Sequence, residues 1–271
     1  MAPPITLCGS ISSLAGPVGR SLHEAGYREL GLAFTYVPFE VRNLEGAITG
    51  MRSLGIRGLG VSYPFKEQVV PLLDALDPVA ERIGAVNTVV NEGGRLVGHN
   101  TDWIGAIRAL EEGGRALQRA RVLLLGAGGA ARAIGFGLRE RGAKVTIANR
   151  NAEKAARLAA ETGALSSTWN AATSSLAAYE IVINATPLGQ ADIAREGPVA
   201  RSAIVPGQIV MDIVYKPIRT KLIEDAETAG AIAVNGGRML LFQAVAQFEL
   251  YTGQTAPLPA MEVALAKATG S

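Results

Sequence analysis

The 271-residue sequence contains one cysteine and two histidines, and this scarcity excludes several kinds of site. A single cysteine, Cys8, excludes an intramolecular disulfide and a thiolate cluster for a metal, so we expect it to be buried in a strand. His23 and His99 are far apart and have no acidic or cysteine neighbours at ligand spacing. We therefore predict structural roles for both histidines and no metal site.

Long apolar runs and a charge of one sign are also lacking. No run reaches the roughly 18 residues that cross a bilayer, and the first residues show neither the basic nor the apolar region of a signal peptide. Lys plus Arg is 26 and Asp plus Glu is 24, which indicates no bias toward nucleic acid or a membrane surface. We expect a soluble, cytoplasmic protein with a small-molecule partner, no nucleic acid or membrane partner, and a monomeric or homodimeric state.

The first part of the chain alternates between short apolar segments and helical patterns, which predicts parallel strands with crossover helices. The expected strands are ITLC, AFTYV and GLGVS, and the expected helices lie in GRSLHEAGYREL, LEGAITGMRSLG and KEQVVPLLDAL. The segment NTVVNEGGRLVGHN predicts two strands joined by a Gly-Gly turn. A helix that begins near Trp103 then leads to a second unit.

The second unit opens with RVLLLGAGGAARAIGFGLRERGAKVTIANR, which predicts a strand, a glycine turn, a helix and another strand. EIVINA and IVMDIV predict further strands, and GGRMLLFQAVAQFELYTG predicts a helix that folds back on the first unit. The fold class is therefore α/β, with two α/β domains and a cleft between them. We place the first domain at 1–102, a second domain of the Rossmann type at 103–236, and C-terminal helices that pack on the first domain at 237–271.

The glycine turn has the setting of a dinucleotide site. Gly126 ends an apolar strand, and Gly128 and Gly129 allow the backbone to approach a pyrophosphate. Ala130 and Ala131 allow the close helix packing that a third glycine usually provides, and the N–H groups at the helix start face the anion. The alternative is a glycine turn that binds nothing.

The end of the following strand predicts which cofactor is bound. An NAD site usually has Asp or Glu there to hold the ribose 2′-hydroxyl, but this chain reads Asn149-Arg150-Asn151. The guanidinium of Arg150 suits a 2′-phosphate, and Lys154 follows one helical turn later. We predict NADP rather than NAD; the alternative is that Arg150 is a solvated surface charge.

Lys66 and Asp102 both stand at predicted strand ends, where parallel α/β units expose functional side chains. A lysine and a carboxylate beside a nicotinamide can take and hold the proton of an alcohol while its carbon loses hydride. The alternatives are a lysine that reaches to water and an aspartate that caps a helix.

Seven segments, in this order, resemble the shikimate dehydrogenase family over nearly the whole chain: IRGLGVSYPFKE, IGAVNTVVN, HNTD, LGAGGAARA, ANRN, INATPLG and GGRMLLFQAVAQFELYTG. The resemblance implies reversible NADP-linked reduction of 3-dehydroshikimate to shikimate, with Lys66 and Asp102 as catalytic residues. It implies that the substrate pocket is lined by Ser62, Asn87, Thr101, Tyr215 and Gln243. It implies cofactor contacts from Gly126, Ala127, Gly128, Gly129, Ala130, Asn149, Arg150, Thr186, Pro187, Gly236 and Met239.

The sequence departs from the family at the residues that usually hold the substrate carboxylate. Members usually carry Ser-x-Ser-Pro near the N-terminus, whereas alignment on Pro17 places Leu14 and Gly16 at the serine positions. The usual Asn, Thr and His around the lysine motif are replaced by Gly60, Ser62 and Phe65. These changes resemble a divergent, shikimate dehydrogenase-like branch, in which the carboxylate is held by other groups. The candidates are Ser10, Ser12, Ser13 and Arg20.

We therefore expect an NADP-dependent dehydrogenase of shikimate or a close hydroxycyclohexene carboxylate. One alternative is a dehydrogenase of quinate or an aminoshikimate-like acid, which share the ring and the carboxylate. Another is a sensor that binds NADP and a metabolite without turnover. Because binding alone does not require a proton-transfer pair, Lys66 and Asp102 argue against the sensor.

Overall fold

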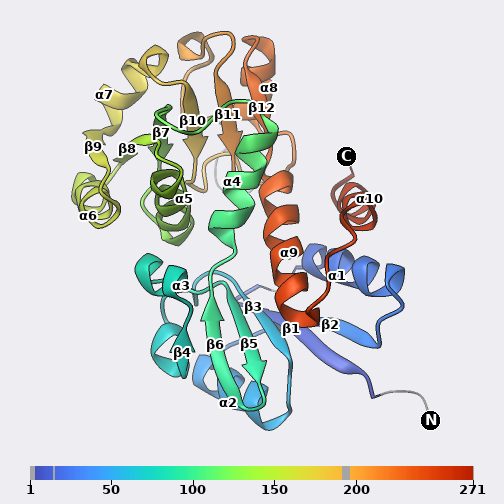
Figure 1. Cartoon of the computed structure of the whole chain (residues 1–271). Helices are drawn as coiled ribbons and strands as arrows, with labels where there is room; N and C mark the ends of the chain where they lie inside the picture. The colour runs from blue at the N-terminus through green and yellow to red at the C-terminus, as the bar shows by residue number, and fades with distance from the viewer. Residues whose placement is uncertain (1–3, 15, 191–195, 271) are drawn as a thin grey trace. The chain divides into compact units, whose positions relative to one another are not determined.

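The chain divides into two compact units, each built on its own sheet. Unit 1 comprises residues 1–101 and 243–271, and unit 2 comprises residues 102–242. The computed structural model describes residues 4–14, 16–190 and 196–270. Both units contain a six-stranded sheet with helices, which confirms the predicted α/β class (Figure 1).

The sheet of unit 1 has the strand order β2-β1-β3-β5-β6-β4. Its strands are β1 (Thr6–Ser12), β2 (Phe34–Glu40), β3 (Gly58–Val61), β4 (Ala75–Leu76), β5 (Thr88–Glu92) and β6 (Arg95–His99). The pairs β1–β2, β1–β3 and β4–β6 are parallel, whereas β3–β5 and β5–β6 are antiparallel. The helices of this unit are α1 (Val18–Glu29), α2 (Leu44–Ser53), α3 (Pro78–Ile83), α10 (Leu258–Thr269) and the part of α9 from residue 243 onward.

Two predictions for unit 1 have opposite outcomes. The hairpin of β5 and β6 around Gly93-Gly94 is confirmed. The helix predicted within KEQVVPLLDAL is wrong, because this segment forms turns, a single 3-10 turn at Val70–Leu72 and the two-residue strand β4. Pro71 supplies no backbone N–H for a helix. The Asp74 side chain accepts a hydrogen bond from the Leu96 backbone N–H at 2.6 Å, which holds the segment at the edge of the sheet.

Burial in unit 1 accounts for the cysteine. Cys8 lies in β1 with no exposed surface, as predicted, and burial raises the pKa of its thiol to about 11. It is therefore a neutral core side chain at physiological pH. Apolar residues of α2 pack against the same sheet, namely Leu44, Ile48 and Met51.

Unit 2 contains a sheet in which every strand pair is parallel, in the order β12-β11-β10-β7-β8-β9. The strands are β7 (Arg121–Leu125), β8 (Lys144–Asn149), β9 (Leu165–Thr168), β10 (Ile181–Asn184), β11 (Ile209–Asp212) and β12 (Ile232–Val234). The strand order reverses direction on either side of β7, so unit 2 is a doubly wound sheet of the Rossmann type.

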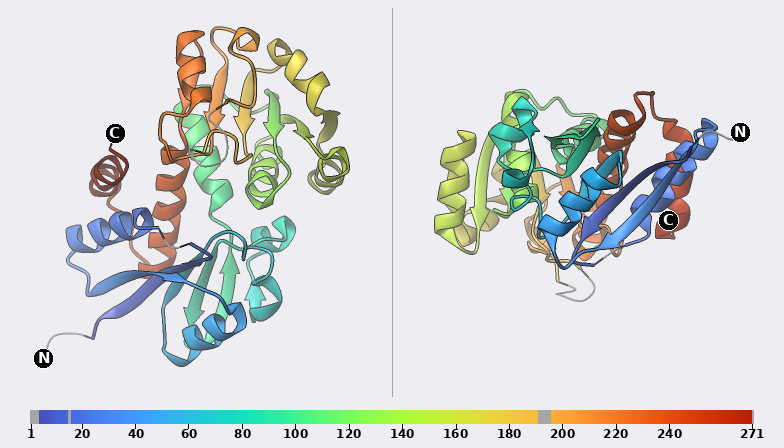
Figure 2. Two further views of the ribbon diagram at one scale, coloured as in Figure 1. Left: turned by 180° about the vertical axis from the view of Figure 1, so that it is seen from behind. Right: turned by 90° about the horizontal axis from the view of Figure 1, so that it is seen from below.

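Helices cover both faces of the parallel sheet. They are α4 (Asp102–Glu112), α5 (Gly129–Glu140), α6 (Ala152–Thr162), α7 (Trp169–Ser174) and α8 (Lys221–Thr228). Figures 1 and 2 show α4 and α5 together on one face and α8 on the other. The helix α9 (Gly236–Thr252) begins in unit 2 and continues into unit 1, where α10 packs against α1.

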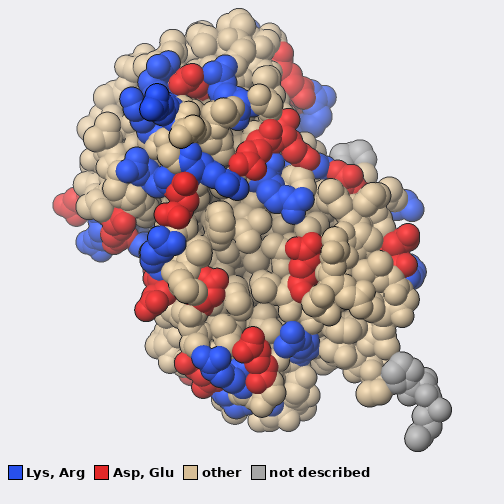
Figure 3. Space-filling model, viewed as in Figure 1, with Lys and Arg blue, Asp and Glu red and all other residues tan. Residues whose placement is uncertain are grey.

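The surface carries both signs of charge. On the face shown in Figure 3, Lys and Arg side chains are interspersed with Asp and Glu side chains, in keeping with the net charge of +2. Among the described residues, no helix combines the length and the apolarity that a membrane span requires.

Candidate functional site

A buried polar cluster surrounds the side chain of Asn87 in unit 1. Its Oδ1 accepts hydrogen bonds from the Thr101 backbone N–H at 2.6 Å and from the Thr88 hydroxyl at 2.8 Å. Its Nδ2 donates to Thr101 Oγ1 at 3.0 Å and to Gln243 Oε1 at 3.4 Å. The structure thus brings together three predicted substrate-binding residues, Asn87, Thr101 and Gln243.

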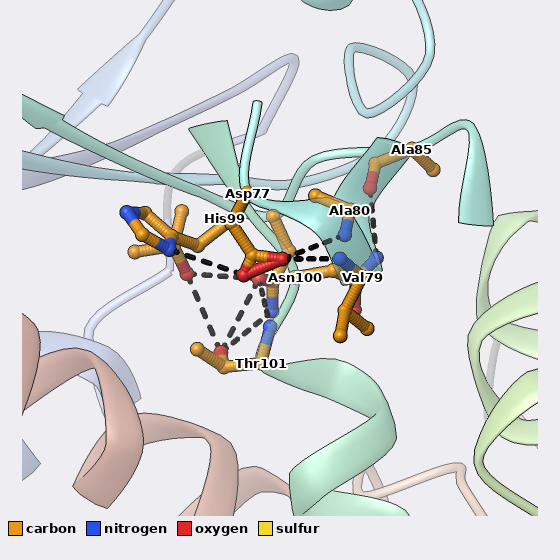
Figure 4. A network of polar contacts seen from close by, with 9 residues as sticks. Asp77, Val79, Ala80, Ala85, His99, Asn100 and Thr101 are labelled. Atoms are coloured by element: carbon orange, nitrogen blue, oxygen red, sulfur yellow. Dashed lines mark hydrogen bonds and ion pairs between the residues drawn. The ribbon is translucent and has the colours of Figure 1, made fainter. Parts of the chain in front are cut away.

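A second network, shown in Figure 4, holds the residues that precede Thr101. Asp77 Oδ1 accepts from the backbone N–H groups of Val79 and Ala80, at 2.6 and 2.9 Å, and so caps α3. His99 Nδ1 lies 3.5 Å from Asp77 Oδ2, and Asn100 Nδ2 donates to the Ala85 carbonyl at 2.9 Å. These contacts fix the end of β6, which supports the predicted structural role of His99.

Ser62 directly follows β3, and Lys66 lies in the turns that replace the predicted helix. The Lys66 carbonyl accepts a hydrogen bond from Val86 N–H at 2.8 Å, next to Asn87. The side chain of Lys66 is half-buried and that of Ser62 is exposed. The backbone of Lys66 is therefore hydrogen-bonded to the residues that precede β5, which include Asn87. Lys66 does not begin a helix.

Asp102 directly follows Thr101 and is the first residue of α4. Its side chain is 5% exposed. A carboxylate in the first turn of a helix interacts favourably with the helix dipole. The first-turn position agrees with a role of Asp102 at the start of the helix.

The residues considered for the substrate carboxylate differ in their surroundings. Leu14 is 80% exposed and follows the end of β1. The Ser13 hydroxyl donates to the Tyr63 carbonyl at 3.5 Å, whereas the half-buried Ser10 bonds to the Tyr36 hydroxyl. Ser12 is half-buried and Arg20 is exposed on α1. Residue 15, in the middle of the altered segment, lies outside the described residues.

The glycine turn of unit 2 has the geometry of a dinucleotide site. Gly126 has φ = 121°, and a Cβ there would lie 2.7 Å from the Ala185 carbonyl oxygen, so only glycine fits. A Cβ on Gly128 would meet no atom within 4 Å, so the chain leaves open space beside this residue. α5 begins at Gly129 with no side-chain cap, which leaves its first N–H groups for an anion.

The end of β8 carries the residues predicted to read the ribose. Asn149 ends the strand, and its Nδ2 donates to the Asn151 carbonyl at 3.1 Å. Asn151 caps α6 by accepting from the Lys154 N–H at 3.0 Å. Arg150 and Lys154 are both exposed, so two cations flank this strand end and no carboxylate ends it.

A buried carboxylate that the sequence reasoning missed ties together two loops of unit 2. Asp212 ends β11 with no exposed surface. Its Oδ1 accepts from Asn184 Nδ2 at 2.9 Å and from Val214 N–H at 3.1 Å, and its Oδ2 accepts from the Thr220 hydroxyl at 2.7 Å. Asn184 Oδ1 accepts in turn from the Thr186 hydroxyl at 2.7 Å. The network thus orders the loops of Thr186–Pro187 and of Tyr215.

Burial dominates the electrostatics of Asp212. It raises the pKa of this carboxyl from 3.8 to about 6, although the three donors favour the ionised form. The signal that singled out Asp102, an acidic residue at the end of an apolar strand, would have found Asp212 in IVMDIV as well.

The start of α9 approaches the Tyr215 loop closely. A Cβ on Gly236 would lie 2.4 Å from the Ile213 carbonyl oxygen and 2.5 Å from that of Val214, so only glycine allows this approach. Tyr215 is 37% exposed and Met239 is buried. Three predicted cofactor residues therefore lie in segments that contact one another. Thr186 and Pro187 follow Asn184, which is bonded to Asp212, and Gly236 packs against the backbone just after Asp212.

The parallel sheet, its glycine turn and its cationic strand end are the features of a domain that binds a dinucleotide. Three family models match: the shikimate dehydrogenase substrate-binding domain at residues 15–89, shikimate/quinate 5-dehydrogenase at 108–215, and the shikimate 5′-dehydrogenase C-terminal domain at 236–265. The chain belongs to the shikimate dehydrogenase family.

Individual relatives agree with the family models. The NADP(+) shikimate dehydrogenase of Moorella thermoacetica is 40% identical, over 97% of this chain and 94% of its own. A Thermus thermophilus shikimate 5-dehydrogenase structure, in complex with NADP(H) and shikimate, is 33% identical with a TM-score of 0.89, over 97% of this chain and 99% of its own. A Corynebacterium glutamicum quinate dehydrogenase in complex with NAD is 30% identical with a TM-score of 0.90, over 98% and 100%.

Proposed function

We propose that the protein is an NADP-dependent shikimate dehydrogenase, which oxidises shikimate reversibly to 3-dehydroshikimate. The observation that carries this proposal is the cluster of Asn87, Thr101 and Gln243. In this cluster the buried side chains of Asn87 and Thr101 hold the partly exposed amide of Gln243, next to the backbone that carries Lys66, and amide and hydroxyl groups suit a polyhydroxylated ring.

Unit 2 supplies the cofactor side of the proposal. The open space at Gly128 and the uncapped start of α5 fit a pyrophosphate, and Arg150 with Lys154 fits a 2′-phosphate. The chemistry that NADP would supply when bound here is uptake of the hydride from the substrate carbon. The residues proposed to contact it are Gly126, Ala127, Gly128, Gly129, Ala130, Asn149, Arg150, Thr186, Pro187, Gly236 and Met239.

In this proposal the chain's own residues handle the proton. The amine of Lys66 takes the proton of the substrate hydroxyl as the carbon loses hydride, and returns it in the reverse reaction. Asp102 supplies negative charge that favours the protonated amine. Asn87, Thr101, Gln243, Ser62 and Tyr215 orient the ring.

Quinate oxidation is the second candidate, and the quinate dehydrogenase relative together with the altered carboxylate segment favours it. Steady-state rates with shikimate, quinate and an aminoshikimate, each with NADP and NAD, decide between these functions. The proposal predicts the highest kcat/KM for shikimate with NADP. A higher value for quinate would replace it with the second candidate, and binding without turnover of any acid would indicate a sensor.

The altered carboxylate segment calls for a separate comparison of shikimate with its carboxamide. A hydrogen bond to a charged group contributes about 1.5 to 3 kcal/mol, or tenfold or more in affinity. If the chain holds the acid through other groups, the acid is strongly preferred. Equal efficiency for both compounds would mean that no carboxylate-binding group exists and that shikimate is not the natural substrate.

A further inference from the structure

The side chain of Gln247 reaches Asn87 from the neighbouring turn of α9. Gln247 lies four residues after Gln243, on the same face of the helix, and is 4% exposed. Its Nε2 donates to the Asn87 backbone carbonyl at 3.1 Å and to the Thr88 hydroxyl at 3.0 Å. Two glutamines one turn apart therefore contact the same strand entry.

The Thr88 hydroxyl is hydrogen-bonded both to Gln247 and to the Asn87 side chain. It accepts from Gln247 Nε2 and donates to Asn87 Oδ1, which at 2.8 Å is nearer than the other neighbouring oxygen, Thr101 Oγ1, at 3.3 Å. Thr88 has no exposed surface. The Thr101 N–H donates to the same oxygen, so Oδ1 is held as an acceptor and Nδ2 is turned toward Gln243.

Gly60 makes room for this arrangement. It pairs with Thr88 across the antiparallel strands β3 and β5. A Cβ on Gly60 would lie 3.2 Å from the Tyr36 hydroxyl and 3.4 Å from Gln247 Nε2. A longer side chain at position 60 would meet the amide of Gln247, so the reach of Gln247 depends on the glycine.

We propose that Gln247 and Thr88 are positioning residues, which fix the orientation of the Asn87 amide and thereby the binding of the substrate ring. This inference rests on the proposed function for the identity of the substrate. Neither residue needs to touch the substrate, because Asn87 itself is 2% exposed and its Nδ2 donates to Thr101 Oγ1 and to the partly exposed Gln243, so the orientation of the Asn87 amide fixes these two groups.

The kinetic test uses variants that remove the polar group of one residue at a time. Gln247→Met and Thr88→Val keep the volume and lose the polar groups, whereas Thr88→Ser keeps the hydroxyl. We expect kcat/KM for shikimate to fall about tenfold in the first two and by less than about twofold in Thr88→Ser, with the Kd of NADP unchanged.

Gln208→Met is the matched control in unit 2. Gln208 is 3% exposed, and its Nε2 donates to the carbonyls of Leu176 and Tyr179 at 2.9 and 2.8 Å. Loss of these bonds lowers stability without reaching Asn87. We therefore expect kcat/KM of folded Gln208→Met to stay within about twofold of wild type.

A spectroscopic readout keeps the inference independent of activity. In 15N-labelled protein, NMR relaxation of the side-chain NH2 signals of Asn87 should report a rigid amide group in wild type and Thr88→Ser. The same signals should report a mobile amide group in Gln247→Met and Thr88→Val. Unchanged signals in both polar-loss variants, or a kinetic loss without a change in these signals, would overturn the positioning role. If the signals change in both polar-loss variants but the wild-type protein does not oxidise shikimate, only the proposed function is overturned.

Discussion

The buried histidine of unit 1 makes the stability of this unit depend on pH. His23 has no exposed surface, and its ring stacks on Tyr36 with centroids 4.4 Å apart. Neither ring nitrogen makes a hydrogen bond of good geometry among the described residues; the nearby side chain of Gln247 favours the charged ring, but burial outweighs it. Burial lowers the pKa of His23 from 6.5 to about 4, because the charged ring would lose its hydration.

The sign and size of the effect follow from linkage. Between the two pKa values the unfolded chain binds a proton at His23 and the folded chain does not, so stability is lost as pH falls from 6.5 toward 4. At about 1.4 kcal/mol per pKa unit, the total loss is about 3 kcal/mol, of which about 2 kcal/mol is reached at about pH 5. Replacement of His23 with Phe keeps a stacked ring and removes the titrating group.

The assay is urea unfolding at several pH values from about 7.5 to about 5, with wild type, His23→Phe and the control His99→Gln. Both tryptophans, Trp103 and Trp169, lie in unit 2, so unit 1 is followed by pulsed hydrogen exchange in peptides of β1 and α1. We expect the free energy of unfolding of His23→Phe, relative to wild type, to rise by about 2 kcal/mol over this range. Parallel pH profiles for the two proteins would refute the reasoning.

Further predictions concern unit 2 and the chemistry. The pH dependence from Asp212 has the opposite sign: its raised pKa stabilises the folded state below pH 3.8, and this stabilisation is lost as pH rises through about 6. As pH rises between these values, the free energy of unfolding of Asp212→Asn should therefore increase by up to about 3 kcal/mol relative to wild type. Tryptophan fluorescence during urea unfolding measures it. A constant difference would contradict this. Lys66→Ala should lower kcat at least about a hundredfold with the Kd of NADP unchanged, and Asp102→Asn should lower kcat too. More than half of wild-type turnover in Lys66→Ala would exclude the catalytic role. Arg150→Ala should weaken NADP about tenfold or more in titrations and leave NAD nearly unchanged, whereas equal losses would mean that Arg150 does not bind the phosphate.

The sequence predicts the fold where the pattern is local. Alternating strands and helices, the Gly93-Gly94 hairpin and the turn after β7 all follow from periodicity and glycine placement. The segment after Lys66 misled the prediction because its apolar spacing suits a helix, while Pro71 and the contact of Asp74 with Leu96 favour an edge strand. Local spacing does not reveal such a long-range partner.

The site is less predictable than the fold for the same reason. Asn87, Thr101 and Gln243 were found through a family resemblance, and their hydrogen bonds join segments that are far apart in the sequence. Thr88 and Gln247 escaped notice because a polar residue in an apolar strand or helix acquires meaning only from its partner across the core. Their roles depend on packing at Gly60, which no sequence period encodes.

The central claim is that this chain moves hydride from the shikimate ring to NADP, and isotope transfer tests it most directly. Shikimate that carries deuterium at C3 is incubated with NADP and the wild-type protein, and the reduced cofactor is analysed by mass spectrometry. The account predicts deuterated NADPH in equal amount to 3-dehydroshikimate, with the label lost from the product. Formation of NADPH without deuterium, or no reduced cofactor while NADP and shikimate are both bound, would contradict it.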